Sequence, residues 1–178
     1  GFPGTTLLVS HSRDEVYRIA DQVCVMYNGK NEPVVPVKQL FEQPGSKAAA
    51  ILSGCKNYSQ VVQRGKTTLF ASDWGIQIQT HGEIPDQIKY IGVRAHGFYL
   101  ARGEEANRIP CHVTKVVEDV FSTIVMLLPK GMEQSNPYSN IRMEIGKKEA
   151  KGLEEGQEVV VAFAQGEALL LTEEIQAK

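Results

Sequence analysis

The sequence has 178 residues, of which 42% are hydrophobic and 22% are charged. These proportions are typical of a folded globular protein and exclude wholesale disorder. The net charge of −2 provides no general field that would attract nucleic acid or an anionic membrane, so any anion site has to be built locally. No apolar run approaches the ~18–20 residues that span a bilayer.

The cysteines and histidines argue against a metal site and against a disulfide framework. Cys24, Cys55 and Cys111 are scattered without CxxC spacing, and such an odd, sparse set favours a reducing compartment. The four histidines include no His-x-x-x-His pair that could hold a metal ion. We therefore predict no metal site and a cytoplasmic protein.

The first 53 residues show the pattern of an α/β protein. Residues 5–10 (TTLLVS) are apolar and β-branched, which predicts a buried strand of a parallel sheet. Ser12 and Glu15 match a Ser-x-x-Glu capping box and predict a helix that ends at Asp21. Residues 23–27 (VCVMY) predict a second buried strand.

A hairpin and two short helices are expected next. Asn28-Gly29 is the strongest short hairpin signal and leads into a strand near residues 34–35. Residues 37–42 and 46–53 are typical of short helices. Because continuous apolar strands need further strands beside them, we expect the missing partners to lie upstream of Gly1, in a larger protein of which this chain is the tail.

After residue 54 the pattern changes to short alternating strands separated by Gly, Pro and Asp/Asn turns, as in a small antiparallel barrel or sandwich. Within this half, only residues 147–153 are predicted to be helical. The boundary belongs near residues 53–57, which gives a domain over 1–53 and a second over 54–178. The predicted fold class is mainly β, an OB-like antiparallel β-barrel preceded by a truncated α/β remnant. The predicted strands cover residues 59–63, 67–71, 75–79, 89–94, 109–118, 122–128, 140–145, 158–164 and 167–171.

His11 is a candidate phosphate contact. It directly follows one predicted strand and directly precedes a predicted helix, and in α/β sheets ligands bind at this carboxyl end of a strand. An imidazole there can donate a hydrogen bond to a phosphate oxygen. The alternative is that His11 only satisfies the start of the helix or a loop carbonyl.

The segment 5–30 resembles the end of an ABC-transporter ATPase domain. His11 stands at the place of the family's switch histidine, Glu15 follows in the helix, and Ala20-Asp21 precedes the next strand. The resemblance implies that His11 contacts the γ-phosphate of ATP, bound with Mg²⁺, in the intact protein, and couples hydrolysis to closure of the ATPase dimer. A second copy of the chain is therefore an expected partner.

The chain itself lacks the other parts of an ATP site. Gly65-Lys66-Thr67 imitates the end of a phosphate-binding loop, but Gln60 stands where the earlier Gly is required and the segment reads strand–turn–strand. No apolar strand ends in Asp-Glu to hold the metal and the attacking water. We therefore predict that the chain alone holds no cofactor and is not an ATPase.

The second half resembles a TOBE, or molybdate-binding-protein-like, module over residues 88–171. Such modules form small OB-like barrels that can bind oxyanions between subunits. A switch-histidine segment followed directly by this module resembles importers of molybdate, tungstate or sulfate. The resemblance implies permease subunits as partners and a peripheral position on the inner face of the membrane. The motifs that carry it are Val93-Arg94-Ala95-His96, residues 107–111 (NRIPC), 116–123 (VVEDVFST) and 153–159 (LEEGQEV).

Four residues are candidates for an oxyanion site. A tetrahedral dianion is held best by backbone N–H groups, hydroxyls and one or two cations. Ser122 and Thr123 offer hydroxyls at the start of a predicted strand, and Lys147 and Lys148 stand at the start of the predicted helix. The alternative is that the hydroxyls fill the pleat of a strand and that the lysines are only solvated.

The predicted function is the C-terminal regulatory part of an ABC-importer ATP-binding subunit, in which oxyanion binding and dimerisation replace catalysis. The alternative is a purely structural dimerisation module with no ligand. Binding of single-stranded nucleic acid, a third role of OB-like barrels, is disfavoured because residues 56–178 contain no cluster of basic and aromatic side chains.

Overall fold

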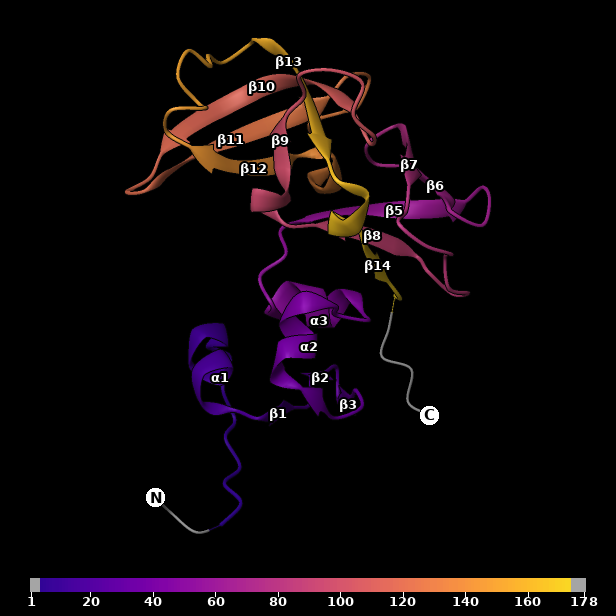
Figure 1. Ribbon diagram of the computed structural model, residues 1–178, viewed down its shortest axis with the longest axis vertical. Coiled ribbons are helices and arrows are strands. Elements are labelled where there is room, and N and C mark those ends of the chain that lie inside the picture. Colours follow the sequence, from indigo (N-terminus) through magenta and orange to yellow (C-terminus); the bar gives the residue numbers. More distant parts are fainter. Residues whose placement is uncertain (1–3, 174–178) are drawn as a thin grey trace.

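The computed structural model describes residues 4–173 and is mainly β, with the α-helices gathered below the β-rich part (Figure 1). None of the helices in this range has the length and hydropathy of a membrane-spanning segment. The helices are α1 (Arg13–Ile19), α2 (Val37–Glu42), α3 (Lys47–Leu52), η1 (Ala95–Gly97), η2 (Pro137–Ser139) and η3 (Gln165–Glu167). The strands are β1 (Gln22–Val23), β2 (Met26–Tyr27), β3 (Lys30–Asn31), β4 (Val35–Pro36), β5 (Asn57–Gln63), β6 (Thr68–Ala71), β7 (Ile76–Gln79), β8 (Tyr90–Val93), β9 (Phe98–Leu100), β10 (Ile109–Glu118), β11 (Ser122–Pro129), β12 (Ile141–Gly146), β13 (Glu158–Phe163) and β14 (Leu169–Leu171).

The hairpin and the two short helices predicted for residues 28–53 are confirmed. Asn28 and Gly29 have φ angles of 48° and 73° and close the turn between β2 and β3, as a two-residue hairpin loop requires. α2 covers the predicted residues. Ser46 caps α3, because its hydroxyl oxygen accepts a hydrogen bond from the Ala49 amide at 3.0 Å.

The two buried strands predicted in the first 27 residues are wrong. Residues 5–10 form no strand, and Leu7 and Val9 are 90% and 89% exposed. A strand needs a neighbour for its N–H and C=O groups, and no described strand pairs with this segment. The second predicted strand is divided into β1 and β2, which pair with β4 and β3 respectively.

The helix predicted after Ser12 forms, but without its capping box. The Ser12 side chain makes no capping hydrogen bond, and Glu15 instead accepts a hydrogen bond from the Ser10 hydroxyl at 2.7 Å. The helix ends at Ile19, before Asp21, and buries none of its residues. α1 contacts α2 through an edge-on pair of aromatic rings, Tyr17 and Phe41, whose centroids lie 5.0 Å apart.

The β-rich part consists of two five-stranded antiparallel sheets. One has the order β12-β11-β10-β13-β9, and the other has the order β14-β8-β5-β6-β7. β12 also lies against β9, so the first sheet is nearly closed into a barrel. Every strand predicted after residue 54 is confirmed, whereas β9, with three residues, is too short to show an alternating pattern and was missed. The OB-like, mainly β fold is confirmed, and the domain boundary near residues 53–57 stays a prediction.

Both sheets share one hydrophobic core. β9 joins the sheet of the later strands through β13, whereas the C-terminal β14 joins the sheet of the earlier strands through β8. At the centre, Trp74 meets the rings of Phe98 and Phe163 edge-on, with centroids 6.1 Å apart in each pair. Because buried residues of both sheets belong to this one cluster, the two sheets form one packed body.

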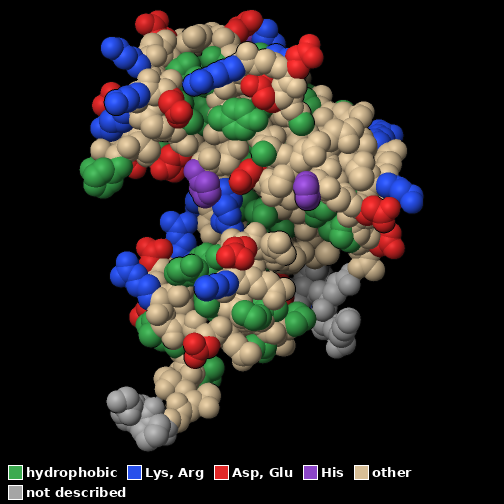
Figure 2. Space-filling model, viewed as in Figure 1, with side chains coloured by type: hydrophobic (Ala, Val, Ile, Leu, Met, Phe, Trp, Pro, Cys, Tyr) green, Lys and Arg blue, Asp and Glu red, His purple; other side chains and the backbone are tan. Residues whose placement is uncertain are grey.

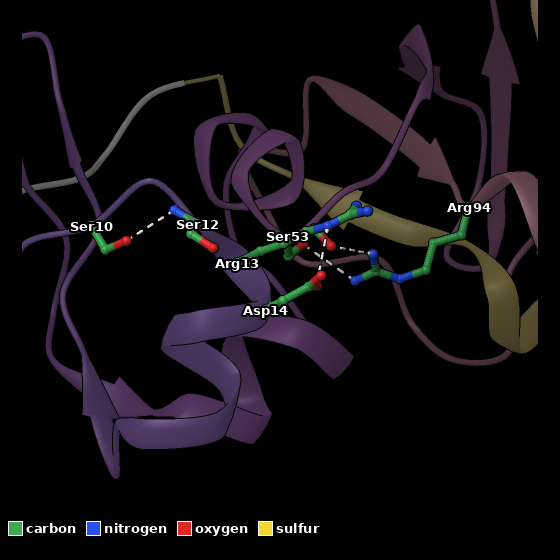
Figure 3. A network of polar contacts seen from close by, with 6 residues as sticks. All are labelled: Ser10, Ser12, Arg13, Asp14, Ser53 and Arg94. Carbon is green, nitrogen blue, oxygen red and sulfur yellow. Dashed lines mark hydrogen bonds and ion pairs between the residues drawn. The ribbon is translucent and has the colours of Figure 1, made fainter.

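Arg94 links the β-rich part to the helical part through hydrogen bonds. Its guanidinium donates hydrogen bonds to the Ser53 carbonyl at 2.9 Å and to the Phe41 carbonyl. Figure 3 shows the side chain reaching toward Ser53, the C-cap residue of α3. One cation therefore satisfies carbonyl groups at the C-terminal ends of both α2 and α3, where the helix dipoles favour positive charge.

A second contact between the two parts is made by Lys47 of α3. Its ammonium lies over the rings of Tyr90 and Tyr138, 4.1 Å and 4.5 Å from their centroids, and donates to the Tyr138 hydroxyl at 2.8 Å. Each such cation–π contact stabilises by ~0.5–2 kcal/mol. Tyr138 belongs to the segment between β11 and β12, so this segment links the first sheet to α3.

Replacing Arg94 by Lys should lower the free energy of unfolding by ~1.5–3 kcal/mol, because a single ammonium cannot serve both helix ends. Urea unfolding followed by circular dichroism measures this loss. Arg108→Lys, at an exposed position, is the matched control and should change the value by less than ~0.5 kcal/mol. An equal effect of the two substitutions would show that Arg94 has no anchoring role.

Only one of the three thiols should react rapidly in the folded protein. Cys24 is exposed, whereas Cys55 and Cys111 are buried; burial raises the pKa of both buried thiols, that of Cys111 to about 12. Because the thiolate is the reactive species, an aromatic disulfide reagent at pH 8 should label one thiol quickly and all three after denaturation. Cys24→Ser should remove the fast phase, and a persisting fast phase would contradict the burial of the other two.

Candidate functional site

The pairing of β11 with β12 brings Ser122 and the two candidate lysines to one end of the first sheet. Ser122 lies opposite Gly146, and Lys147 and Lys148 follow Gly146 directly. Because paired strands lie ~4.8 Å apart, Ser122 and the two exposed lysines that follow Gly146 lie at the same end of the sheet. We call this surface, defined by Ser122, Lys147 and Lys148, the lysine end.

Thr123 lies on the other face of β11. Its side chain is 3% exposed, and burial alternates along the strand, with Val125 and Leu127 on the same buried face. Ser122 is on the half-buried face. Of the two candidate hydroxyls, the one that faces the surface is therefore that of Ser122.

The helix predicted over residues 147–153 is wrong. A single turn forms, in which the Ala150 amide donates to the Gly146 carbonyl at 3.1 Å. Gly152 has a φ of 88°, outside the right-handed helical region, so the helix cannot continue beyond its first, unfavourable turn. Lys147 and Lys148 are exposed on this turn, and the helix N-terminus that was expected beside them does not form.

The hydroxyl of Ser122 already has a partner. It donates a hydrogen bond to the Glu144 carboxylate at 2.8 Å. A carboxylate at this place favours bound cations and repels an anion. An oxyanion at the lysine end would have to draw the hydroxyl away from Glu144, with the two lysines offsetting the negative charge.

His11 lies on a different surface. It lines an open depression of about 370 Å³ together with Arg13 and Lys56, and the apolar side chains of Ile51 and Leu52 form part of the wall. Figure 2 shows a hollow between the helical and the β-rich parts on the face in view. The residues that line the depression come from the start of α1, the end of α3 and the approach to β5, and none of the four oxyanion candidates is among them.

The cations beside His11 were missed by the sequence reasoning. Arg13 forms an ion pair with Asp14 at 3.7 Å, and Figure 3 shows its side chain pointing toward Ser53. Gly54 has a φ of 94°, and a Cβ at this position would collide with the Arg13 guanidinium. The glycine therefore lets Arg13 cross the end of α3. The sequence signal for Arg13 was its place two residues after His11.

The described residues, 4–173, contain no group of three or more His, Cys, Asp or Glu side chains that could hold a metal ion. The two candidate surfaces offer hydroxyl, imidazole and cationic groups, and each also carries a carboxylate, Glu144 beside Ser122 and Asp14 beside Arg13. An anion at either surface would be attracted by the cations and repelled by the carboxylate.

Comparison with curated proteins identifies relatives among importer subunits. The chain is 27% identical over 170 residues to the molybdate/tungstate import ATP-binding protein WtpC of Pyrococcus abyssi, an alignment that covers 89% of this chain and 45% of that protein. The WtpC of Thermococcus kodakarensis is 32% identical over 97 residues, which cover 54% and 28% of the two chains. The Fe(3+) ions import ATP-binding protein FbpC 1 of Haemophilus influenzae is 27% identical over 115 residues, which cover 64% and 34%. The chain thus spans less than half the length of these relatives, and no protein-family model matches it.

A solved structure with a similar fold is that of the cytoplasmic molybdate-binding protein ModG with molybdate bound. The TM-score is 0.51 at 12% sequence identity, and the similarity covers 66% of this chain and 96% of ModG. The chain is therefore a homologue of the ATP-binding subunits of ABC importers, and its β-rich part has a TOBE-like fold similar to that of ModG.

Proposed function

We propose that the chain is the C-terminal regulatory part of an ABC-importer ATP-binding subunit for a molybdate-like oxyanion, with a role in binding and dimerisation rather than in catalysis. The observation that supports this proposal is the strand register in which Ser122 lies opposite Gly146, the residue that precedes Lys147 and Lys148. The relatives named for molybdate and tungstate import and the fold of ModG support it.

The proposed mechanism is a coupling of two binding events. An oxyanion held between two copies of the lysine end would favour one arrangement of the paired subunits, and this requires unequal affinity for the two arrangements. In the intact protein, which would bind ATP and Mg²⁺ through residues outside this chain, His11 would contact the γ-phosphate. The intact subunit would work in the cytoplasm, bound to permease subunits at the membrane.

A structural dimerisation module without a ligand is the second candidate. The hydrogen bond from Ser122 to the Glu144 carboxylate favours it, because this bond satisfies the hydroxyl without any anion. The two functions differ in their response to added oxyanion, which the following experiments measure.

Molybdate, tungstate or sulfate should stabilise the chain against thermal unfolding. The expected gain is RT ln(1 + [L]/Kd), or ~2.7 kcal/mol at a hundredfold excess over Kd. Ser122→Ala should remove most of this gain and leave the unliganded melting point nearly unchanged. Lys148→Ala should weaken the gain and reduce its dependence on salt.

Two controls accompany this titration. Lys38→Ala, at an exposed position of α2, removes a lysine far along the chain from the lysine end and should leave the gain unchanged. Phosphate should stabilise less than molybdate, because its protonated form carries a donor that a site built of donors leaves unpaired. If millimolar oxyanion has no effect on the melting point, the ligand-free dimerisation module remains.

Glu144→Gln should tighten oxyanion binding by about tenfold, or ~1.4 kcal/mol, because the substitution removes a negative charge beside the Ser122 hydroxyl. Glu133→Gln, in the segment at the opposite end of β11 and β12, should have no effect. Isothermal titration with molybdate measures both. Equal affinity of the two variants would place the oxyanion away from Ser122.

A further inference from the structure

Two arginines from different parts of the molecule meet at the C-terminal end of α3. Arg94, which follows β8, donates hydrogen bonds to the carbonyl and the hydroxyl oxygen of Ser53 at 2.9 Å and 3.2 Å. Arg13, the first residue of α1, places its guanidinium against Gly54. Figure 3 shows the two side chains extending toward Ser53 from opposite sides of the view. We call Ser53 and Gly54 the α3 junction, because each of them receives one of the two arginines.

The backbone of the α3 junction leaves room for Arg13. The Cys55 amide donates to the Ala50 carbonyl at 2.9 Å. This bond closes α3 around a left-handed residue, Gly54, whose φ is 94°. A Cβ on Gly54 would collide with the Arg13 guanidinium. Glycine therefore serves two purposes here: it adopts the left-handed conformation, and it leaves the space that the guanidinium fills.

The ion pair of Arg13 with Asp14 does not account for this position. The two side chains are 53% and 82% exposed and their charged atoms are 3.7 Å apart, and ion pairs so exposed contribute little to stability. Arg13 lines two depressions: one is beside His11, and the other, of about 470 Å³, includes Phe41 and Ser53. Its side chain therefore runs between the two depressions and across the α3 junction.

A hydrogen-bonded turn connects Arg13 to His11. The Ser12 amide donates to the Ser10 hydroxyl oxygen at 3.0 Å, and the Ser10 hydroxyl donates to the Glu15 carboxylate at 2.7 Å. His11 therefore lies within a turn that is bonded to the first turn of α1. Because of these bonds, a change in the position of Arg13 is transmitted to His11.

We propose that Arg13 is a positioning residue that transmits the position of the β-rich part to His11. Arg94 attaches the α3 junction to the β-rich part, and Arg13 attaches the His11 turn to the same junction. A rearrangement of the β-rich part that displaces Arg94 would move Ser53 and Gly54 and, through Arg13, the imidazole. The inference rests on the proposed function, because it names the residues through which the regulatory part would act on the histidine proposed to contact the γ-phosphate.

The test is a double-mutant cycle in the full chain without oxyanion, followed by NMR. Arg94→Lys should shift the ring signals of His11 and should speed amide exchange in α1 by at least about fivefold. The amides observed are those of Val16 and Ala20, which donate to backbone carbonyls at 3.0 Å. In the Arg13→Ala background, Arg94→Lys should leave the His11 signals in place and should change these exchange rates by less than about twofold.

Gly54→Asn tests the same contact without removing a charge. Asparagine tolerates a left-handed backbone, and the guanidinium is the far end of a flexible side chain, so the substitution displaces Arg13 at little cost to folding. Gly54→Asn should therefore abolish the response of His11 to Arg94→Lys, as Arg13→Ala does. If Arg94→Lys loosens the whole helical part, Ser53→Ala perturbs the α3 junction more mildly, because it removes only the bond of 3.2 Å from Arg94.

Matched controls separate this role from a general loss of stability. Arg18→Ala removes a cation from the last turn of α1 and should leave the response of His11 to Arg94→Lys intact. Arg108→Lys, at an exposed position, should shift no His11 signal in either background. The ring signal of His81, which is exposed, should stay constant in every variant and serves as the internal reference.

Equal effects of Arg94→Lys with and without Arg13 would overturn the proposal, because His11 would then follow the β-rich part by another route. A His11 signal that Arg94→Lys does not move in the original chain would also overturn it. The proposed function fails separately. If the cycle shows the coupling but molybdate neither stabilises the chain nor shifts the His11 signal, the α3 junction stands and the oxyanion role is removed.

Discussion

The packing of two sheets around one hydrophobic core is the constraint on which the rest of the structure depends. Trp74, Phe98 and Phe163 meet edge-on at its centre, and the Trp74 indole donates to the Tyr138 carbonyl at 3.1 Å. The buried Asn57 joins the sheets as well, because its side chain bonds both the carbonyl and the amide of Arg142. With the interior filled, the register of β11 against β12 cannot slip without moving buried side chains to the surface. The place of the lysine end follows from that register.

The same two strands connect the lysine end to the helical part. At one end of β11 and β12 lie Ser122 and Gly146. At their other end, the connecting segment is held by the bond from Asn136 to Asp73 and by the contact of Tyr138 with Lys47 of α3. A ligand bound at the first end, as proposed, would therefore act on a series of packed elements that leads to α3. Coupling along this series is measured by the effect of binding at one site on binding at the other.

The helical part is stabilised more by its contacts with the β-rich part than by its own internal packing. Its own buried cluster is small, and α1 buries none of its residues. Arg94 and Lys47 supply the contacts that its short helices cannot provide, since helices of six or seven residues are not stable alone in water. Residues 7–9 leave their apolar side chains exposed.

Much of the secondary structure could be predicted from the sequence alone. The sequence by itself determined the Asn28-Gly29 hairpin and the alternating strands of the β-rich part, because turn geometry and two-residue periodicity are properties of neighbouring residues. Only the tertiary structure decided which strands are neighbours, that Thr123 faces the core, and that Glu144 lies beside Ser122. Residues 5–10 were predicted wrongly because a strand needs a partner from elsewhere, and residues 147–153 because the backbone leaves the helical region at Gly152. The local sequence pattern does not reveal which distant segments pair and pack together. The candidate site consists of such contacts, so its arrangement could not be predicted from the sequence.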